Sequence, residues 1–275
     1  MKRVKIHCPV CNTSGKIQVD ERLLETNQKG ITAINIDESI ICSHSFVAYI
    51  DKNYNVRDSF VSDFKIDLPD VQIQNKGRLD DFRDLDKINL DSLLSEISAV
   101  ELSSILNGVF SKQNVLLLND SEVVSQNLHK ILDFIFKDTF ISNISILNHL
   151  EYIRYKWNYD NYEIVDYDEI FDGDKKKKYL KNMKIESAMV KKFLSEEYAK
   201  SGLIILRSEI IKAFELSNTI IKILHNHTEM QELTKKDVSE SLSEKYGINI
   251  QSEYLDFLLE IVKNYHQQDL SRLAD

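Results

Sequence analysis

The sequence predicts an α+β protein, in which a small β domain built around metal ligands precedes a larger domain with an α/β layer and a helical C-terminal segment. All three cysteines lie within the first 42 residues, where the chain otherwise reads as short strands. From residue 91 onward, apolar residues recur at helical spacing and are interrupted by short apolar runs typical of buried strands. With only 7 Gly and 2 Pro, the chain favours long regular elements.

The composition is that of an acidic globular chain. Its 275 residues, enough for about two domains, are 43% hydrophobic and 29% charged, with a net charge of −9. Because binding to phosphate backbones depends on a positively charged face, this balance argues against nucleic acid as a partner. No apolar run approaches the roughly 18 residues that span a bilayer, and the basic start MKRVKIHCPVCN is not followed by an apolar segment. We therefore predict a soluble, cytoplasmic protein without a membrane span.

Residues 1–67 read as short strands joined by turns. Apolar and β-branched residues predict strands over 4–7, 15–19, 31–36, 45–50 and 56–66. The segments 12–15 (NTSG) and 51–55 (DKNYN) carry the Asn and Gly typical of turns. A domain of this size buries little apolar surface, and a bound metal would compensate for its small core.

The cysteines of this domain form a metal-ligand pattern. Cys8 and Cys11 make a C-x2-C pair, and Cys42 with His44 makes a C-x-H pair further along the chain. Two such pairs supply the four N and S ligands of a closed tetrahedral Zn²⁺ site, if the second pair arrives from another hairpin. His7 is a competing fourth ligand, but adjacent strand residues point to opposite faces, so His7 and Cys8 would not converge on one ion. The alternative is that the thiols are small buried apolar side chains.

This ligand set and its surrounding strands resemble the zinc-ribbon class over about a quarter of the chain. We predict a structural zinc, because four protein ligands leave no open position for catalysis. Zinc ribbons bind nucleic acid, bind protein or only stabilise a fold, and the resemblance does not choose among these roles.

A linker and a long amphipathic stretch follow the β domain. Residues 68–90 are rich in aspartate and show little periodicity, which predicts an acidic linker. Asp91 and Ser92 are cap-type residues before a helical stripe that runs from Leu93 to Leu106. Gly108 either ends this helix or marks a close packing contact.

The rest of the segment 91–174 predicts an α/β layer. Residues 115–118 (VLLL) suit a buried parallel strand, and 144–147 and 162–167 predict two more strands. Between them, Asn119-Asp120-Ser121 caps a helix. Its predicted buried face is Val124, Leu128, Ile131, Leu132 and Ile135. Strand, helix and strand at this spacing form a βαβ unit.

Residues 175–275 read as helical throughout, with breaks near Gly202, 225–228 and 246–247. The part from 234 to 262 follows a helix-turn-helix pattern, which makes a transcription-related nucleic-acid protein an alternative function.

The second helix of that pattern bears against the alternative. A helix that reads DNA exposes Arg or Lys, whereas this one offers Glu253, Asp256 and Glu260.

Few residues suggest catalysis. Asp166 and Asp168 leave the same face of a strand, and paired carboxylates can hold Mg²⁺ or do acid/base work, so a metal-dependent enzyme is a third hypothesis. The simpler interpretation is that these acidic side chains solvate a loop at the end of the strand.

Two further runs of polar residues have simple explanations. His225-Asn226-His227 ends a helix, where histidine suits the negative end of the helix dipole, and Lys175–Lys178 is read as a solvent-exposed junction. The chain has no glycine-rich phosphate loop, G-x-S-x-G or H-E-x-x-H, and we predict no enzymatic activity.

The order of elements from residue 93 to 168 carries a second resemblance. An amphipathic helix leads to NVLLLND, then to the helix SEVVSQNLHKILDFIF, the strand ISILN and a stretch ending in EIVDYD. This order resembles the α/β core of DENN-type modules, which a helical segment follows, as it does here from 175 onward. The proline-rich stretch and N-terminal longin-like domain of that family are missing. The resemblance implies a protein that binds a small GTPase or promotes its nucleotide exchange, which works by opening the switch regions of the GTPase rather than by covalent chemistry.

Overall fold

The computed structural model confirms the α+β class, with antiparallel strands first and a helical region with a parallel sheet after them. It describes residues 2–9, 11–20, 31–37, 39–44, 46–61, 68–69, 90–166, 183–196, 198–226, 233–266, 270 and 273–274. Most of the predicted linker therefore lies outside the described residues. The division into four segments stays a prediction.

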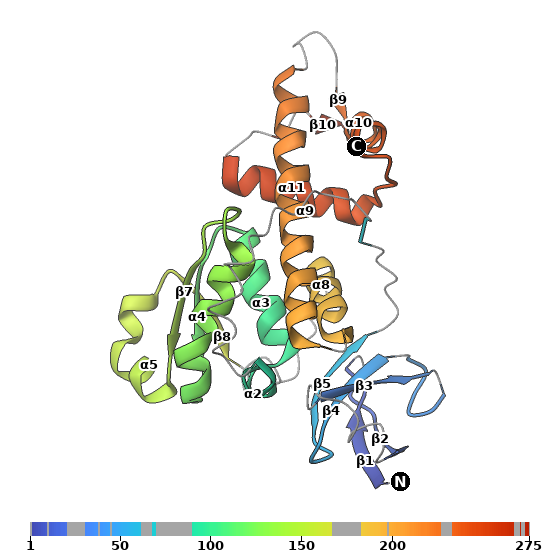
Figure 1. The fold of residues 1–275 in the computed structure, drawn as a ribbon, viewed down its shortest axis with the longest axis vertical. Coiled ribbons are helices and arrows are strands. Elements are labelled where there is room, and N and C mark those ends of the chain that lie inside the picture. The colour runs from blue at the N-terminus through green and yellow to red at the C-terminus, as the bar shows by residue number, and fades with distance from the viewer. Residues whose placement is uncertain are drawn as a thin grey trace.

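Among the described residues of the N-terminal part, five antiparallel strands lie close to the ranges predicted from the sequence, and the predicted residues 62–66 of the last strand fall outside the described residues. They are β1 (Lys2–His7), β2 (Ser14–Val19), β3 (Ile31–Ile36), β4 (Phe46–Asp51) and β5 (Val56–Val61). β1 and β2 pair as one hairpin, and β3, β4 and β5 form a three-stranded sheet in that order (Figure 1).

Strand β4 joins two hydrophobic cores. All six of its residues are buried. Because alternate residues of a strand face opposite sides, Phe46, Ala48 and Ile50 pack with the apolar residues of β1 and β2. Val47 and Tyr49 belong instead to the larger core, which is built from the helices and the parallel sheet. The N-terminal strands are thus packed against the rest of the molecule.

The helical stripe predicted from Leu93 to Leu106 is two helices, α2 (Leu90–Glu96) and α3 (Ala99–Phe110). The prediction of one helix was wrong because Ser98 adopts an extended conformation and caps α3. Its side chain accepts a hydrogen bond from the Glu101 N–H, and the Glu101 carboxylate accepts one from the Ser98 N–H. This capping box satisfies two helix-end donors at once.

A parallel sheet of three strands lies beside α3. The strands are β6 (Asn114–Leu118), β7 (Asn143–Leu147) and β8 (Tyr162–Asp166), in the order β7-β6-β8. Gly108 lies inside α3 against this sheet, and a Cβ there would collide with the Val115 side chain. The close-packing interpretation of Gly108 is therefore the correct one.

Helix α4 connects β6 to β7 as the pattern predicts. It spans Glu122–Phe136, and all five residues of its predicted inner face are buried. The short helix α5 (His149–Tyr155) and the 3-10 helix η3 (Lys156–Tyr159) connect β7 to β8. In Figure 1, α5 lies at the outer side of the sheet.

Helix α9 (Ala199–Asn226) runs through the molecule and packs against the other C-terminal helices (Figure 1). These are α8 (Lys184–Ser195), α10 (Lys235–Tyr246) and α11 (Ser252–His266). The helix break predicted near Gly202 lies between Ser195, where α8 ends, and Ala199, where α9 begins. Gly202 itself is inside α9, where a Cβ would stand 2.6 Å from the Phe193 backbone oxygen. The glycine serves the close crossing of α8 and α9.

The C-terminal region is not entirely helical. The short strands β9 (Leu233–Thr234) and β10 (Leu273–Ala274) pair in parallel. Residues 273–274 are thus held by strand pairing beside the residues that directly precede α10. Among the described residues, no helix combines the length and apolar character that crossing a membrane requires.

Candidate metal centre and carboxyl-edge pocket

The first ligand pair lies in the turn between β1 and β2. Cys8 follows β1 directly, and its N–H donates to the Thr13 carbonyl at 2.9 Å. The Asn12 N–H donates back to the Cys8 carbonyl at 2.9 Å. Asn12 has a φ of 59°, a left-handed conformation that asparagine tolerates. This turn holds Cys8 and Cys11 on the same side of the hairpin.

The second pair comes from the connection between β3 and β4. There the Ser39 N–H donates to the Cys42 carbonyl at 2.7 Å, which closes a local turn. Ile41 lies against Gly15 of β2, where a Cβ would stand 2.8 Å from a side-chain carbon of Ile41. Because Gly15 has no side chain, this connection can approach the first hairpin closely and place His44 next to Cys8.

The four predicted ligands meet at one point. One donor atom from each of Cys8, Cys11, Cys42 and His44 lies within 4.8 Å of all the others. The His44 Nδ1 is 3.8 Å from the Cys8 sulfur and 3.6 Å from the Cys42 sulfur. Tetrahedral coordination with ordinary zinc bond lengths places sulfur and nitrogen about 3.6 Å apart. The cluster can therefore hold a metal ion, and exposed His7 is not part of it.

The exposed ligand is favoured in its anionic form. Interactions with the Thr13 side chain and backbone lower the pKa of the Cys11 thiol to about 6. Metal ions bind the thiolate, so a ligand that loses its proton near neutral pH suits a metal centre.

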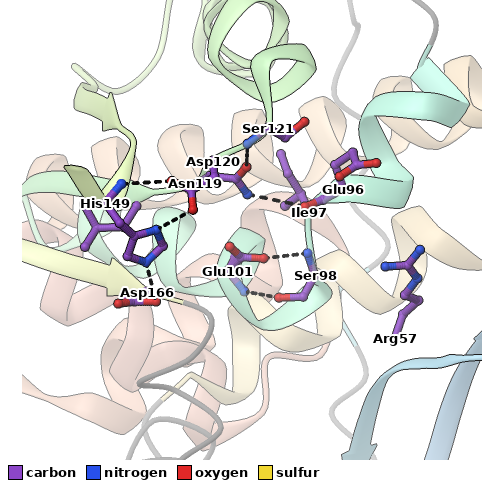
Figure 2. A pocket seen from close by; sticks show the side chains of 11 residues that line it. Arg57, Glu96, Ile97, Ser98, Glu101, Asn119, Asp120, Ser121, His149 and Asp166 are labelled. Carbon is purple, nitrogen blue, oxygen red and sulfur yellow. Dashed lines mark hydrogen bonds and ion pairs between the residues drawn. The ribbon is translucent and has the colours of Figure 1, made fainter. Parts of the chain in front are cut away.

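A second candidate site lies at the carboxyl edge of the parallel sheet. A pocket of about 500 Å³ opens where β6, β7 and β8 end, and it reaches α2, α3 and β5 (Figure 2). Its lining residues are Arg57, Glu96, Ile97, Ser98, Glu101, Leu118, Asn119, Asp120, Ser121, His149 and Asp166. In open parallel α/β sheets the usual ligand site is the crevice beyond the carboxyl ends of the strands, at the point where the strand order reverses. In the order β7-β6-β8 the chain passes from β6 to β7 on one side and then to β8 on the other side.

His149 connects the ends of the three strands. Its Nδ1 lies 3.1 Å from Asp120, which follows β6, and its Nε2 lies 3.5 Å from Asp166 at the end of β8 (Figure 2). The backbone N–H of His149 also donates a hydrogen bond to the Asp120 carboxylate at 2.9 Å. Its hydrogen bond to Asp120, reinforced by Asp166, raises the pKa of His149, while the contact with His149 lowers the pKa of Asp120. The imidazole is thus favoured as a cation between two carboxylates.

Glu101 is the most deeply buried acid of this pocket, with 1% of its surface exposed. One oxygen of its carboxylate accepts the capping hydrogen bond from the Ser98 backbone N–H at 2.7 Å. Among the described residues, no donor makes a hydrogen bond to its other oxygen, Oε1. Burial raises the pKa of Glu101, although Ser98 and Asn119 oppose this, and Asp166 raises it further.

The structure places only part of the predicted carboxylate pair. Asp166 lies in the pocket, whereas Asp168, Lys175–Lys178 and His227 fall outside the described residues. The metal-dependent enzyme hypothesis stays a prediction.

The pocket could not be predicted from the sequence pattern, in which His149 has no assigned role and Asp120 is only part of a helix cap. The sequence feature that could have indicated the pocket is that polar residues stand at or directly after the carboxyl ends of β6, β7 and β8. Glu101 gave no such signal, because it comes from a different element.

The predicted helix-turn-helix pattern corresponds to two helices, α10 and α11, joined by a turn at Gly247. Thr234 caps α10 in a capping box with Asp237, and Gly247 ends α10 with a φ of 66°. Helix α11 packs its apolar face into the core and leaves Glu253, Asp256 and Glu260 exposed. The exposed face is acidic, as the sequence predicts.

Comparison with known proteins adds no further identification, because no protein family, curated protein or solved structure matches this chain.

Proposed function

We propose that this chain is a zinc-stabilised, non-enzymatic protein-binding protein whose partner is a small GTPase. The zinc part rests on the match between the 3.6 and 3.8 Å nitrogen–sulfur distances and tetrahedral geometry. Four ligands of the Cys₃His type suit Zn²⁺ and leave no position for substrate. The zinc is structural, and it holds the β1–β2 turn against the β3–β4 connection.

The binding part rests on one exposed apolar surface, formed by Leu150, Ile153 and Trp157 of α5 and η3. Their spacing of three and four residues places them on one side of the helical segment. Their exposed fractions are 79%, 67% and 65%, and no residue of α5 or η3 is buried. Large exposed apolar side chains gathered in this way are typical of a protein interface.

The partner class follows from the resemblance of residues 93–168 to the DENN-type core. The helix, strand, helix and strand order of that core corresponds to α3, β6, α4 and β7, and β8 stands at the closing strand. Helices α8 to α11 stand where that family has its helical segment. The resemblance concerns the order of helices and strands along the chain. The exposed surface on α5 and η3 lies within the same residues, 93–168.

A binding measurement tests the proposal. Purified small GTPases from the same genome, each in GDP-bound and nucleotide-free form, are titrated against the full chain. We expect at least one to bind with micromolar affinity or better, and Leu150→Asp and Trp157→Ala to weaken it at least tenfold.

Tyr198→Asp is the matched control, because Tyr198 is also a large exposed apolar side chain, at 52%, but lies outside the surface. It should leave the affinity unchanged. Absence of binding across the panel would overturn the partner class. Equal loss with Tyr198→Asp would overturn the choice of surface.

A further inference from the structure

Among the residues that line the carboxyl-edge pocket, carboxylates outnumber basic groups. Four carboxylates line it, from Glu96, Glu101, Asp120 and Asp166, against two basic groups. One of these, Arg57, directs its Nε to Asp51 outside the pocket lining at 2.8 Å. The other, His149, lies between Asp120 and Asp166. Among the described residues, no ion pair joins Glu96 or Glu101 to a basic group.

Glu101 also presents an acceptor to the pocket. Its Oε1 is buried and receives no hydrogen bond from any described residue, although a buried polar atom ordinarily has a partner. The side chain cannot turn away easily, because its other oxygen is held by the Ser98 N–H. A ligand that donates an N–H to Oε1 would satisfy this atom and supply positive charge.

The shape of the site favours an organic cation over a metal ion. The volume of about 500 Å³ lies in the range of small-molecule pockets, which is roughly 300 to 1,000 Å³. Ile97 and Leu118 give part of the wall an apolar character. Among the described residues, the only trio or larger group with donor atoms close enough to hold a metal is the cysteine cluster.

We propose that the carboxyl-edge pocket binds an ammonium or guanidinium group on a short apolar stem, with Glu101 Oε1 as its hydrogen-bond acceptor. Such a group belongs either to a free small amine or to a lysine or arginine side chain of a partner protein. This proposal does not depend on the small GTPase.

Binding of a cation here is coupled to protons. The cation favours ionised Glu101, and it is repelled by protonated His149, so it competes with protons at both groups. The charged groups facing them are Glu96, Asp120, Asp166 and Arg57. The affinity for a permanently charged ligand should rise with pH, and binding should release protons.

Calorimetric titration of the full chain with agmatine and putrescine tests the proposal. We expect millimolar or tighter binding of at least one cation, and no binding of the uncharged analogue 1,4-butanediol. Nα-acetyl-lysine and Nα-acetyl-arginine methylamides distinguish the source, because a site for a partner's side chain prefers them over the free amines. Heats in buffers of different ionisation enthalpy report the released protons.

Glu101→Gln is the decisive variant, because the glutamine oxygen can keep the capping hydrogen bond from Ser98, while an NH2 group replaces the acceptor Oε1 and the negative charge is lost. It should weaken binding at least tenfold. Glu122→Gln makes the same change at an exposed position beside the pocket and should alter the affinity less than twofold. Asp120→Asn, at an exposed acid of the lining, provides a second test and should weaken binding severalfold.

Two results would overturn the proposal. One is the absence of any heat with all four cations at 10 mM, together with an unchanged melting temperature. The other is an affinity that Glu101→Gln leaves intact. A failure to bind small GTPases bears only on the protein-binding function, since these titrations contain no GTPase.

Discussion

The carboxylate of Asp58 on β5 accepts a hydrogen bond from the Val100 N–H at the start of α3, with an oxygen–nitrogen distance of 3.1 Å. The first N–H groups of a helix have no partner within it, and a negative charge there also suits the helix dipole. Asp58 is 2% exposed, and its other oxygen accepts the Ser59 N–H at 2.7 Å. Burial, with the Asp58 charge nearby, raises the pKa of Tyr49. This contact joins the N-terminal strands to the α/β layer.

Replacing Asp58 tests this connection. Asp58→Ala leaves the buried N–H of Val100 without its acceptor, and we expect the free energy of unfolding to fall by about 1–3 kcal/mol. Urea denaturation followed by circular dichroism measures the change. Asp133→Ala, at an exposed position of α4, is the control and should have little effect. An equal midpoint for the two variants would show that the contact contributes nothing.

Metal content distinguishes the two histidines near the cysteine cluster. His44 lies in the cluster and His7 does not, so His44→Gln should lose the metal and His7→Gln should retain about one zinc per chain. Elemental analysis of the purified proteins gives the ratio. A native protein without zinc, folded normally in its N-terminal strands, would refute the zinc assignment.

Removal of one thiolate should destabilise the N-terminal strands most. Cys11 is exposed, so Cys11→Ser removes a ligand without opening a cavity. We expect faster amide exchange in β1, β2 and the β3–β4 connection, because the metal contributes folding free energy there. If β4 and α3 exchange equally fast, the predicted boundary after residue 67 is wrong.

A buried acid makes stability depend on pH. Glu186 of α8 is 3% exposed and accepts a hydrogen bond from the Asn107 amide at 2.9 Å. Burial raises the pKa of Glu186 from 4.5 to about 7, which Asn107 partly opposes. Between these values the folded state binds the proton and the unfolded state does not, so stability should fall as pH rises from about 4.5 through about 7.

Glu186→Gln should remove this dependence. At pH 8 the variant should be more stable than the natural protein by on the order of 3 kcal/mol, the free energy that corresponds to this pKa change. Urea unfolding at several pH values between 5 and 8.5 measures it, with exposed Glu244→Gln as the control. Parallel pH curves for the natural protein and Glu186→Gln would contradict the assignment.

The packing at Gly108 predicts a rescue. Gly108→Ala introduces a Cβ that collides with Val115, and such overpacking typically destabilises by about 1–3 kcal/mol, more than alanine gains in helix propensity. In the background Val115→Ala the same substitution should be harmless or favourable. Additive effects in this double-mutant cycle, measured by thermal unfolding, would show that the two residues do not interact.

Local pattern was sufficient where a short segment specifies its own structure. The positions of strands β1 to β8, the inner face of α4 and the cap at Thr234 could be predicted, because alternation, helical spacing and capping act over a few residues. The pairing of β9 with β10 could not, because it joins segments that are far apart in the chain. The cap at Ser98 was missed although its S-x-x-E pattern with Glu101 is local, because the apolar stripe continues across it. A helix break near Gly202 was predicted, but the place of Gly202 itself inside α9 depends on how α9 packs against Phe193 of α8.

The sequence by itself determined the α+β class and the set of residues that can hold a metal, since ligand type and pair spacing are local properties. Only the tertiary structure decided that β4 belongs to two cores and that Glu101, Asp120, His149 and Asp166 share one pocket. The physical reason is that parallel strands bring their carboxyl ends to one edge of the sheet. The N-terminus of α3, capped by Ser98, lies beside that edge. Residues that are separate in the chain thereby meet around one volume.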